Sequence, residues 1–420
     1  MNRISKKRRK TKAEVIPVGT VLEELVRENL REFVFEQGMV ALHSVLEEER
    51  SLLCGAPYER GKRASRRAGS APGELVLGGR KVAVKRPRVR DAEGEVMLDS
   101  YRYFSESDPL QARALEQMVV GVSTRKYQRS LEDVPAAMDP RSTSKSAVSR
   151  RFVAATKRQL KTCLEASLED LDIKAVMLDG IHLAKHLVVI AVGIDSDGCK
   201  HVLGFWEGST ENTEVCVSLV SDLVRRGLDS QKSTLFVIDG GKALRKAISL
   251  VFGTRAVVQR CQIHKMRNVV GHLPKELQPS VRQTMREAYA SRSYKTALAR
   301  LRRLASSLSE EWTGACASLK EGLEETLTIT HVGLTKNLER SLCSTNIIEN
   351  LNGSIRHMTR RVKTWKTGTM ALRWVATAVF EAKKKFRRLR GYKNMFRLVQ
   401  YLEARDQQLN RAVDQEEMAA

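Results

Sequence analysis

The sequence lacks the features that mark membrane, secreted and disulfide-rich proteins. No apolar run approaches the roughly 18–20 residues that a membrane-spanning helix needs. The basic N-terminal stretch MNRISKKRRKTKAE has no apolar core of the kind that a secretory signal carries. The seven cysteines are an odd number scattered along 420 residues, which does not fit a disulfide framework. We therefore expect a soluble protein of the reducing cytoplasm, with no membrane partner.

Acidic residues are also scarce relative to basic ones. The chain has 73 lysines and arginines but 49 aspartates and glutamates, a formal net charge of +24. A protein this basic usually binds a polyanion, because neutralising phosphates releases their condensed counterions. The composition thus predicts a nucleic acid as partner and association with the nucleoid. A chain of this length, with 42% hydrophobic residues, can form two or three domains.

Residues 1–57 combine a basic tail with a periodic apolar segment. Large apolar residues recur there at helical spacing: Leu22, Leu25, Val26, Leu30, Phe33 and Val34. The pattern predicts an amphipathic helix. This helix could pack locally or against another subunit, so the segment is a candidate for oligomerisation.

Residues 58–168 form the predicted DNA-binding region, which begins with a hairpin. The stretch RGKRASRRAGSAPG is typical of a loop, and ELVLGGRKVAVKRPRVR follows it. Two alternating runs flank Gly78 and Gly79, which tolerate the positive φ of a tight turn, so the pattern predicts a β-hairpin. Its second strand carries the basic residues Arg80, Lys81, Lys85, Arg86 and Arg88. Such a strand suits a phosphate backbone, although a solvated face has the same composition.

The rest of this region, 107–165, has helical periodicity. A break at 121–123 separates two helical patterns, and a third helix after Pro140 carries Lys145, Arg150 and Arg151. A basic helix at the end of such a set fits a helix-turn-helix, whose last helix enters the major groove of DNA. Any small helical bundle shows the same pattern.

Residues 169–275 alternate between strand and helix patterns. Three strand segments come first, KAVMLDGIHL, KHLVVIAVGID and KHVLGFWEG, followed by the helix TEVCVSLVSDLVRRGL, the strand STLFVID, a second helix and the strand AVVQR. The order β-β-β-α-β-α-β predicts an RNase H-like mixed sheet. A Rossmann fold would alternate strands and helices from the start.

Two of these strands lead into aspartates. The first strand is expected to end at Asp179 and the fourth at Asp239, so neighbouring strands would bring the two carboxylates together. Adjacent carboxylates repel unless they share a proton or a cation, and Mg²⁺ prefers such oxygen ligands. Gly240 and Gly241 leave room for a bulky partner. An aspartate before a helix can also be a simple N-cap.

Two later segments carry a family resemblance. VQRCQIHKMRNVVGHLPK and STNIIENLNGSIR are similar to the Gln-Arg-Cys-x-x-His-x-x-Arg-Asn and Thr-Asn-x-x-Glu-x-x-Asn segments of Mutator-type bacterial insertion-sequence transposases. The strand with Asp179 and the segment VIDGGKAL match the same family in the same order. The resemblance implies a DDE active site of Asp179, Asp239 and Glu349. It also implies an all-helical insertion at 276–335 and a last core helix within 336–390. The basic sequence after Glu349 is only loosely similar to the family, and residues 391–420 are expected to form a C-terminal tail.

The resemblance further implies a reaction. Two Mg²⁺ ions, or Mn²⁺ in their place, would be held by Asp179, Asp239 and Glu349 about 3.5–4 Å apart. Hydrolysis would free 3′-OH groups at the element's terminal inverted repeats, and these would attack target DNA. Both partners are double-stranded DNA, and holding two ends implies a homodimer or larger assembly. A DNA-binding regulator and a nuclease without strand transfer are the alternatives.

Several residues near the acids are assigned less directly. Cys261 and His264 form half of a zinc motif whose other half is missing; they and Asn350 are candidate auxiliary residues. The spacing of Asn346 and Glu349 also fits a capping box. Four residues of the Cys-His segment are expected to contact the DNA backbone: Arg260, Lys265, Arg267 and Asn268.

Overall fold

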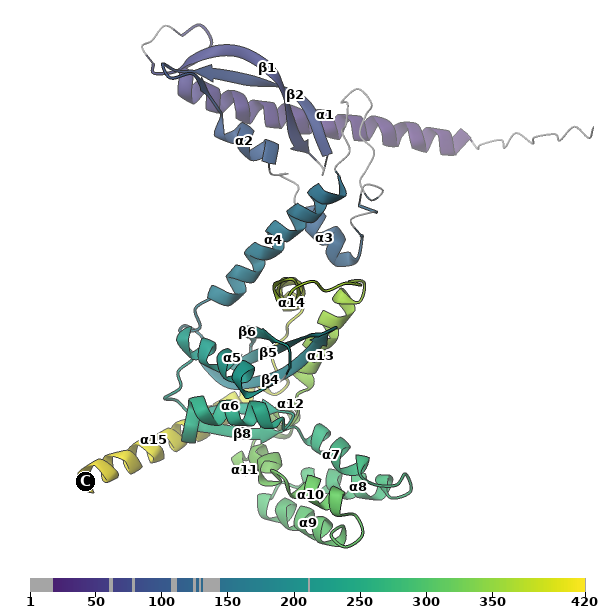
Figure 1. Cartoon of the computed structure of the whole chain (residues 1–420), viewed down its shortest axis with the longest axis vertical. Coiled ribbons are helices and arrows are strands. Elements are labelled where there is room, and N and C mark those ends of the chain that lie inside the picture. Colours follow the sequence, from purple (N-terminus) through teal and green to yellow (C-terminus); the bar gives the residue numbers. More distant parts are fainter. Residues whose placement is uncertain are drawn as a thin grey trace, which may run out of the picture. The chain divides into compact units, whose positions relative to one another are not determined.

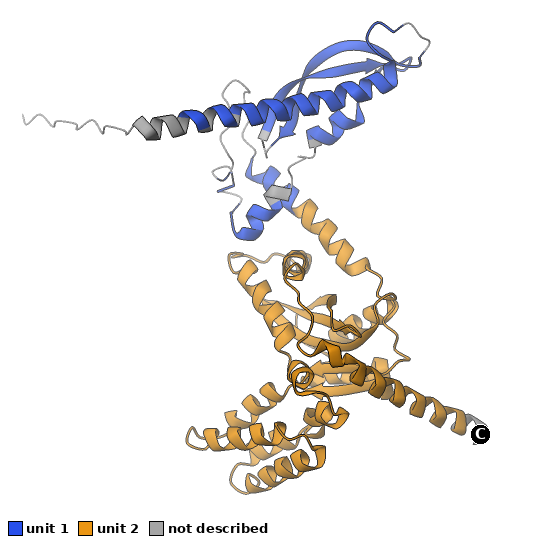
Figure 2. Ribbon diagram, turned by 180° about the vertical axis from the view of Figure 1, so that it is seen from behind, with its two compact units in different colours: residues 1–152 blue, residues 153–420 orange. Residues whose placement is uncertain are grey.

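The computed structural model divides the chain into two compact units, Met1–Phe152 and Val153–Ala420 (Figure 2). It describes residues 18–59, 63–77, 80–106, 112–123, 126–127, 130, 144–210 and 212–419. Within these residues no helix is both long and apolar enough to cross a membrane. The boundary between the units falls inside helix α4 (Lys145–Glu165), which the sequence assigned to the DNA-binding region.

The first unit contains the predicted hairpin. Strand β1 (Arg66–Leu77) pairs antiparallel with β2 (Arg80–Arg90), and Leu77 lies opposite Arg80, so the hairpin is confirmed although its glycine turn lies outside the described residues. The loop expected before it was wrong, because half of that stretch belongs to β1. An edge strand accommodates glycine and proline, and β1 lies at the edge with a bulge between Arg67 and Ser70.

Helix α1 (Val18–Cys54) packs on this hairpin. The residues that make this contact are not the apolar residues from which the helix was predicted. Phe35, Met39, Leu42 and Leu46 join the hairpin's core, and Figure 1 shows the hairpin lying along the second half of the helix. Of the apolar residues that predicted the helix, Leu25, Val26, Leu30, Phe33 and Val34 are exposed, and the side chain of Leu22 lies outside the described residues. The prediction of a helix is confirmed, and α1 extends well beyond the predicted segment.

The remaining elements of the first unit are short. They are β3 (Glu95–Val96), α2 (Asp99–Glu106), α3 (Ala112–Val120) and the start of α4. Helix α3 ends at Gly121, whose φ of 104° lies in the region that favours glycine, as the predicted break requires. The middle helix of the expected helix-turn-helix lies outside the described residues.

A five-stranded mixed sheet forms the centre of the second unit. Its strands are β4 (Ile173–Leu183), β5 (His186–Asp195), β6 (Lys200–Gly208), β7 (Thr234–Ile238) and β8 (Ala256–Arg260). The spatial order is β6-β5-β4-β7-β8, with antiparallel pairing through β4, β5 and β6 and parallel pairing of β7 to both β4 and β8. The predicted succession of strands and helices is confirmed.

Helices cover both faces of this sheet. Alternate residues of β4, such as Val176 and Leu178, pack beneath α5 (Thr213–Arg225) and α6 (Lys242–Phe252). The residues between them, such as Met177, face α13 (Asn346–Thr359), α14 (Gly368–Lys383) and α15 (Met395–Ala419) (Figure 1). The period of two along β4 thus divides the unit into two apolar cores.

The segment between β8 and α13 is helical, as predicted. Its elements are α7 (Gln262–Gly271), α8 (Gln278–Tyr289), α9 (Tyr294–Ser307), α10 (Thr313–Lys320), α11 (Thr328–Val332) and α12 (Lys336–Leu342). Helices α7 to α10 share a third core that extends to Leu327. Trp312 is partly buried and packs against this core. The insertion therefore has its own packing and does not depend on the sheet alone.

Candidate active site

The parallel pairing of β4 and β7 brings the two aspartates to the same edge of the sheet. Met177 lies opposite Val237, and continuing this register by two residues brings Asp179 level with Asp239. Met177 and Val237 both pack on the face that α13 covers. Because side chains alternate between faces, Asp179 and Asp239 lie on that face too.

Asp179 does not end its strand, so the expected strand end was wrong. Strand β4 continues to Leu183 because it stays paired with β5, whereas β7 ends at Ile238. The Asp179 carboxylate accepts hydrogen bonds from its neighbour Gly180 (N to Oδ1, 3.0 Å) and from Asn352 (Nδ2 to Oδ2, 2.8 Å). Burial, followed by the charges of Asp239 and Glu349, raises the pKa of Asp179 from 3.8 to about 6.

Asp239 is the first residue after β7. Its Oδ1 accepts a hydrogen bond from the Gly241 amide at 2.8 Å, across Gly240, whose φ is 104°. The N-cap of α6 is Gly241, with no side-chain capping bond, so Asp239 is not the helix cap that the sequence left open. The turn instead holds the carboxylate at the carboxyl end of β7.

Glu349 comes from the first turn of α13. It does not form the capping box that the sequence allowed: the N-cap is Thr345, which makes no side-chain capping bond. The Thr345 hydroxyl instead donates to Glu349 Oε1 at 2.7 Å. Glu349 and Asp239 act together on two groups, since their charges raise the pKa of both Asp179 and His264. The charges of Asp239 and Glu349 thus both act on Asp179, which indicates that the three acids lie close together.

Cys261 and His264 lie beside Glu349. His264 Nε2 is 3.8 Å from Glu349 Oε1, and His264 Nδ1 is 3.3 Å from the Thr345 hydroxyl. The hydrogen bond with Cys261 raises the pKa of His264, and the charge of Glu349 adds to this effect against the cost of burial. Burial alone would raise the pKa of the Cys261 thiol, but hydrogen bonds from His264 and Thr345 outweigh it and lower that pKa.

The asparagine that reaches an acid is Asn352, not Asn350. Asn350 is exposed, whereas Asn352 is only 1% exposed and donates to Asp179. The other amide atom of Asn352, Oδ1, is buried and has no hydrogen-bond partner among the residues that the structure describes. The spacing Glu349-x-x-Asn352 was a usable signal, because residues three apart share one side of a helix.

Sequence comparison identifies the family of this chain. The family model described as "Transposase, Mutator family" matches residues 18–388. The chain belongs to the Mutator family. It is 28% identical over 339 residues to the transposase for insertion sequence element IS256 in transposon Tn4001 from Staphylococcus aureus, covering 77% of this chain and 83% of the relative. It is also 28% identical over 401 residues to the transposase for ISRM5 from Rhizobium meliloti, covering 92% and 96%.

Two basic residues that the sequence assigned to DNA are buried in this Mutator-family chain. Lys265 is 4% exposed, and its Nζ donates to the carbonyls of Ser318 and Glu321, both at 2.7 Å, at the end of α10. Arg260 is 8% exposed, and its Nε donates to Glu325 at 2.7 Å. Arg260 thus joins the end of β8 to Glu325, and Lys265 joins α7 to the end of α10, so both side chains make their contacts inside the protein.

The other predicted DNA contacts are at least partly exposed, where the structure describes their side chains. Arg267 and Asn268 lie on the outer side of α7, and Lys145 and Arg150 on α4 are exposed, with Arg151 half-buried. On β2, Lys85 is exposed, whereas three others have acidic partners at 2.7–2.9 Å: Lys81 with Glu74, and Arg86 and Arg88 with Glu95. The side chain of Arg80 lies outside the described residues. The hairpin's charge is thus partly neutralised within its own unit.

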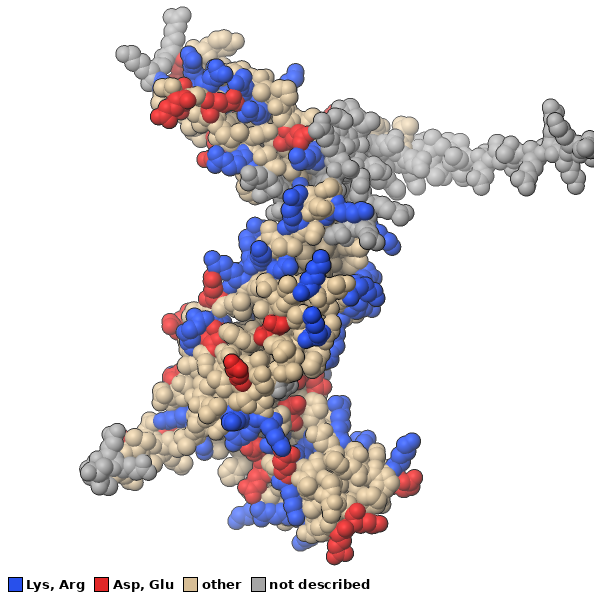
Figure 3. Space-filling model, viewed as in Figure 1, with Lys and Arg blue, Asp and Glu red and all other residues tan. Residues whose placement is uncertain are grey.

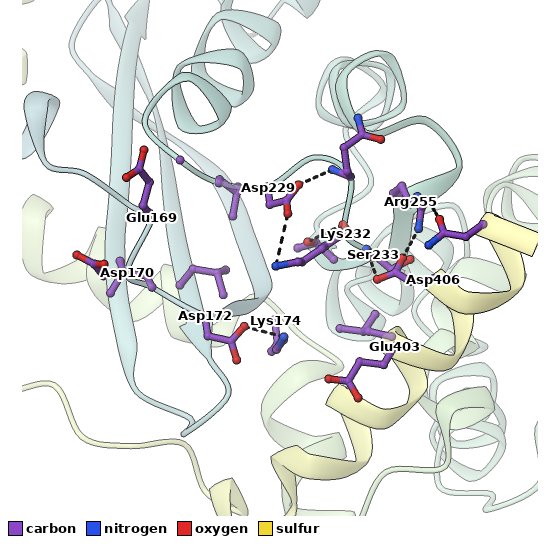
Figure 4. Close-up of a pocket in the computed structure, with 18 of the residues that line it drawn as sticks. Glu169, Asp170, Asp172, Lys174, Asp229, Lys232, Ser233, Arg255, Glu403 and Asp406 are labelled. Atoms are coloured by element: carbon purple, nitrogen blue, oxygen red, sulfur yellow. Dashed lines mark hydrogen bonds and ion pairs between the residues drawn. The ribbon is translucent and has the colours of Figure 1, made fainter. Parts of the chain in front are cut away.

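A second gathering of charged residues lies at the opposite end of the same strands. A cavity of about 790 Å³ is bordered by the beginnings of β4 and β7 and by α15 (Figure 4). Three of its acids have basic partners: Asp172 with Lys174 at 2.7 Å, Asp229 with Lys232 at 3.5 Å and Asp406 with Arg255 at 2.7 Å. Asp406 also accepts from the Ser233 amide at 2.9 Å, so this cluster fastens α15 to the sheet.

Proposed function

We propose that this Mutator-family member is a transposase that cuts DNA at the ends of a mobile element and joins the freed 3′ ends to target DNA in the nucleoid. The convergence of Asp179, Asp239 and Glu349 carries the proposal. The strand order β6-β5-β4-β7-β8, with acids beside the two central parallel strands, supports an RNase H-like scaffold. The similarity to transposases of insertion sequence elements supports the transposase role.

The site fits a hard divalent cation. Three carboxylates supply oxygen ligands of the kind that Mg²⁺ and Mn²⁺ prefer. The raised pKa of Asp179 indicates that its charged form is unfavourable when no cation balances the charge. We propose that Asp179, Asp239 and Glu349 hold two such ions, which when bound would offset the negative charge that develops on the attacking and leaving oxygens.

The surrounding residues orient the acids. Asn352 and the Gly180 amide hold the two oxygens of Asp179, and the Gly241 amide holds Asp239. Thr345 holds Glu349 and also contacts His264. The contacts that raise the pKa of His264 let it retain a proton beside Glu349, where it can neutralise charge next to a phosphate. A site whose side chains are held in this way requires little rearrangement when DNA binds.

A basic track on α13 supports a path for the DNA strand. Arg356 and Arg360 follow Glu349 by seven and eleven residues, which places them on the same side of the helix, and both are exposed. Figure 3 shows Lys and Arg side chains gathered over α4 and around α14 of the second unit. We propose DNA contacts for this track and for Arg267, Asn268 and Lys145.

The exposed side of α1 supports assembly into a dimer. Val26, Leu30, Phe33 and Val40 are each 56–61% exposed and lie opposite the residues that pack on the hairpin. With Gln37 they repeat at intervals of four and three residues, the spacing of helix pairs. This seam (Val26, Leu30, Phe33, Gln37 and Val40) matches a second copy of itself, so we propose that two chains pair through α1.

The dimer is tested by light scattering on the full chain. We expect a dimer for the unaltered protein and a monomer for Leu30→Glu combined with Phe33→Glu. Leu52→Glu is the matched control, because Leu52 is 79% exposed on the same helix but outside the seam. A dimer that withstands the double substitution would contradict pairing through α1.

The reaction is tested with DNA carrying the element's terminal repeats. We expect Mg²⁺-dependent nicking at the element ends, and strand-transfer products when an oligonucleotide with a free 3′-OH is supplied. Binding without nicking would favour a DNA-binding regulator. Nicking without joined products would favour a nuclease.

A further inference from the structure

Three side chains with different donor atoms meet at one wall of the acid site. Cys261 follows β8, His264 lies in the first turn of α7, and Glu349 lies in the first turn of α13. One ligand atom from each lies within 4.8 Å of the other two. The sequence offered only Cys-x-x-His, half of a zinc motif, and the fold brings in a third ligand from 85 residues beyond His264 (349 minus 264).

The local contacts suit each residue to bind a metal. Cys261 is buried and is the N-cap residue of α7. A helix N-terminus favours the thiolate form, which is the form that binds metals. Thr345 lies 3.3 Å from His264 Nδ1, which leaves Nε2 directed at Glu349. Ligating histidines commonly have such a partner on the other ring nitrogen.

The spacing of the donor atoms is close to that of a zinc site. Zinc lies about 2.0–2.2 Å from nitrogen and oxygen ligands, so a nitrogen and an oxygen of a tetrahedral site are about 3.3–3.5 Å apart. The distance from His264 Nε2 to Glu349 Oε1 is 3.8 Å, so the two side chains need to approach by a few tenths of an ångström. Three protein ligands leave the fourth tetrahedral position for water or substrate, as in zinc sites that are not purely structural.

We propose that Cys261, His264 and Glu349 form a Zn²⁺ site, and that zinc bound there withdraws Glu349 from Asp179 and Asp239 and inhibits the enzyme. The inhibitory half rests on the proposed function, whereas the binding half does not. Thiolate and imidazole select zinc over Mg²⁺, which prefers oxygen ligands alone. Glu349 is thus the one ligand that both metals require.

Zinc binding is measured on the full, metal-free chain without DNA. We expect one Zn²⁺ per chain by calorimetry, and Co²⁺ in its place should give the absorption of a thiolate-bound ion. Loss of a residue that only orients a ligand weakens metal binding by about 10–100-fold. Cys261→Ser and His264→Ala each remove a ligand and should weaken zinc binding by more than this. Cys343→Ser is the matched control, because this neighbouring thiol contacts the Arg340 carbonyl and lies outside the ligand set.

Two binding results would overturn the site: no stoichiometric zinc, or zinc affinity unchanged by both Cys261→Ser and His264→Ala. Circular dichroism identifies a variant that has merely unfolded, and the second variant then decides. Asp179→Asn should leave zinc affinity nearly unchanged, because Asp179 lies outside the ligand set.

Inhibition is measured on the nicking of end DNA at fixed Mg²⁺. We expect submillimolar Zn²⁺ to stop nicking of the unaltered protein and excess Mg²⁺ to restore it. Zinc that binds without slowing nicking would overturn the inhibitory half alone. If nicking is missing in Mg²⁺ even without zinc, the proposed function fails, and the calorimetry still decides the zinc site.

Discussion

The two ends of the central sheet of the second unit use charge in opposite ways. Where β4 runs beside the carboxyl end of β7, three acids meet, and burial together with the charges of Asp239 and Glu349 raises the pKa of Asp179 to about 6. At the amino ends of the same strands, each acid of the pairs in Figure 4 has a basic partner. There, hydrogen bonds from Ser233 and Arg255 outweigh burial and lower the pKa of Asp406.

This difference indicates that one end of the sheet is suited to bind a ligand and that the other end stabilises the fold. An acid cluster without its counter-charge weakens the fold and is kept only where a ligand supplies the missing charge. Paired charges stabilise the fold and leave little for a ligand to bind. The carboxyl end is accordingly the candidate for chemistry, and the amino end anchors α15. Substitutions at the two ends should therefore have opposite signatures.

The largest effect is expected from removing one acid charge at the carboxyl end. Asp179→Asn, Asp239→Asn and Glu349→Gln should each reduce end nicking by at least about 1,000-fold, because each removes several kcal/mol of charge stabilisation. DNA binding should persist in a gel-shift assay. Glu403→Gln is the matched control, an exposed acid that borders the cavity at the amino end. Nicking that survives the amide variants would remove the basis for the acid site.

The next effect concerns pH and stability without metal. The pKa of Asp179 in the folded protein, about 6, exceeds its ordinary value of 3.8. Its contribution to stability is therefore present below pH 4 and lost as the pH rises through 6. Asp179→Asn should raise the free energy of unfolding by about 2–3 kcal/mol at pH 8 in chelator. Urea denaturation at pH 4 and pH 8 measures this, and equal changes at both pH values would refute it.

A smaller effect is expected from the residue that holds Asp179. Asn352→Ala should lower nicking by about 10–100-fold and raise the Mg²⁺ concentration for half-maximal rate, since outer contacts orient ligands. A purely structural role would lower the melting temperature without moving the metal dependence. Asn350→Ala, on the exposed side of the same helix, should change neither quantity.

The smallest effect is expected at the amino end. Asp406→Ala should lower the free energy of unfolding by about 1–2 kcal/mol, because the Ser233 amide and Arg255 lose their partner. This loss should shrink at low pH, where Asp406 is protonated in the unaltered protein too. Nicking well below the melting temperature should stay nearly unchanged. If Asp406→Ala abolished nicking and left the free energy of unfolding unchanged, the proposed difference between the two ends would be wrong.

Much of the fold could be predicted from local pattern. The strands of the sheet are short apolar runs bounded by turns, and Asp179 and Asp239 stand at the same offset from paired residues of parallel strands. Other features could not be predicted, because they depend on distant partners. Lys265 and Arg260 resemble DNA contacts because they lie in a basic segment. In the structure, Lys265 instead donates to carbonyls at the end of α10, and Arg260 donates to the carboxylate of Glu325.

The sequence by itself determined the order of strands and helices and the basic balance of the chain, since hydrophobic periodicity and residue type are local properties. Strand patterns indicated Asp179 and Asp239, and the family resemblance added Glu349. Only the tertiary structure decided that Asn352 holds Asp179 and that Glu349 also meets Cys261 and His264. Those contacts join residues that lie far apart along the chain. Their geometry depends on how α13 packs across the sheet, and no local pattern encodes that packing.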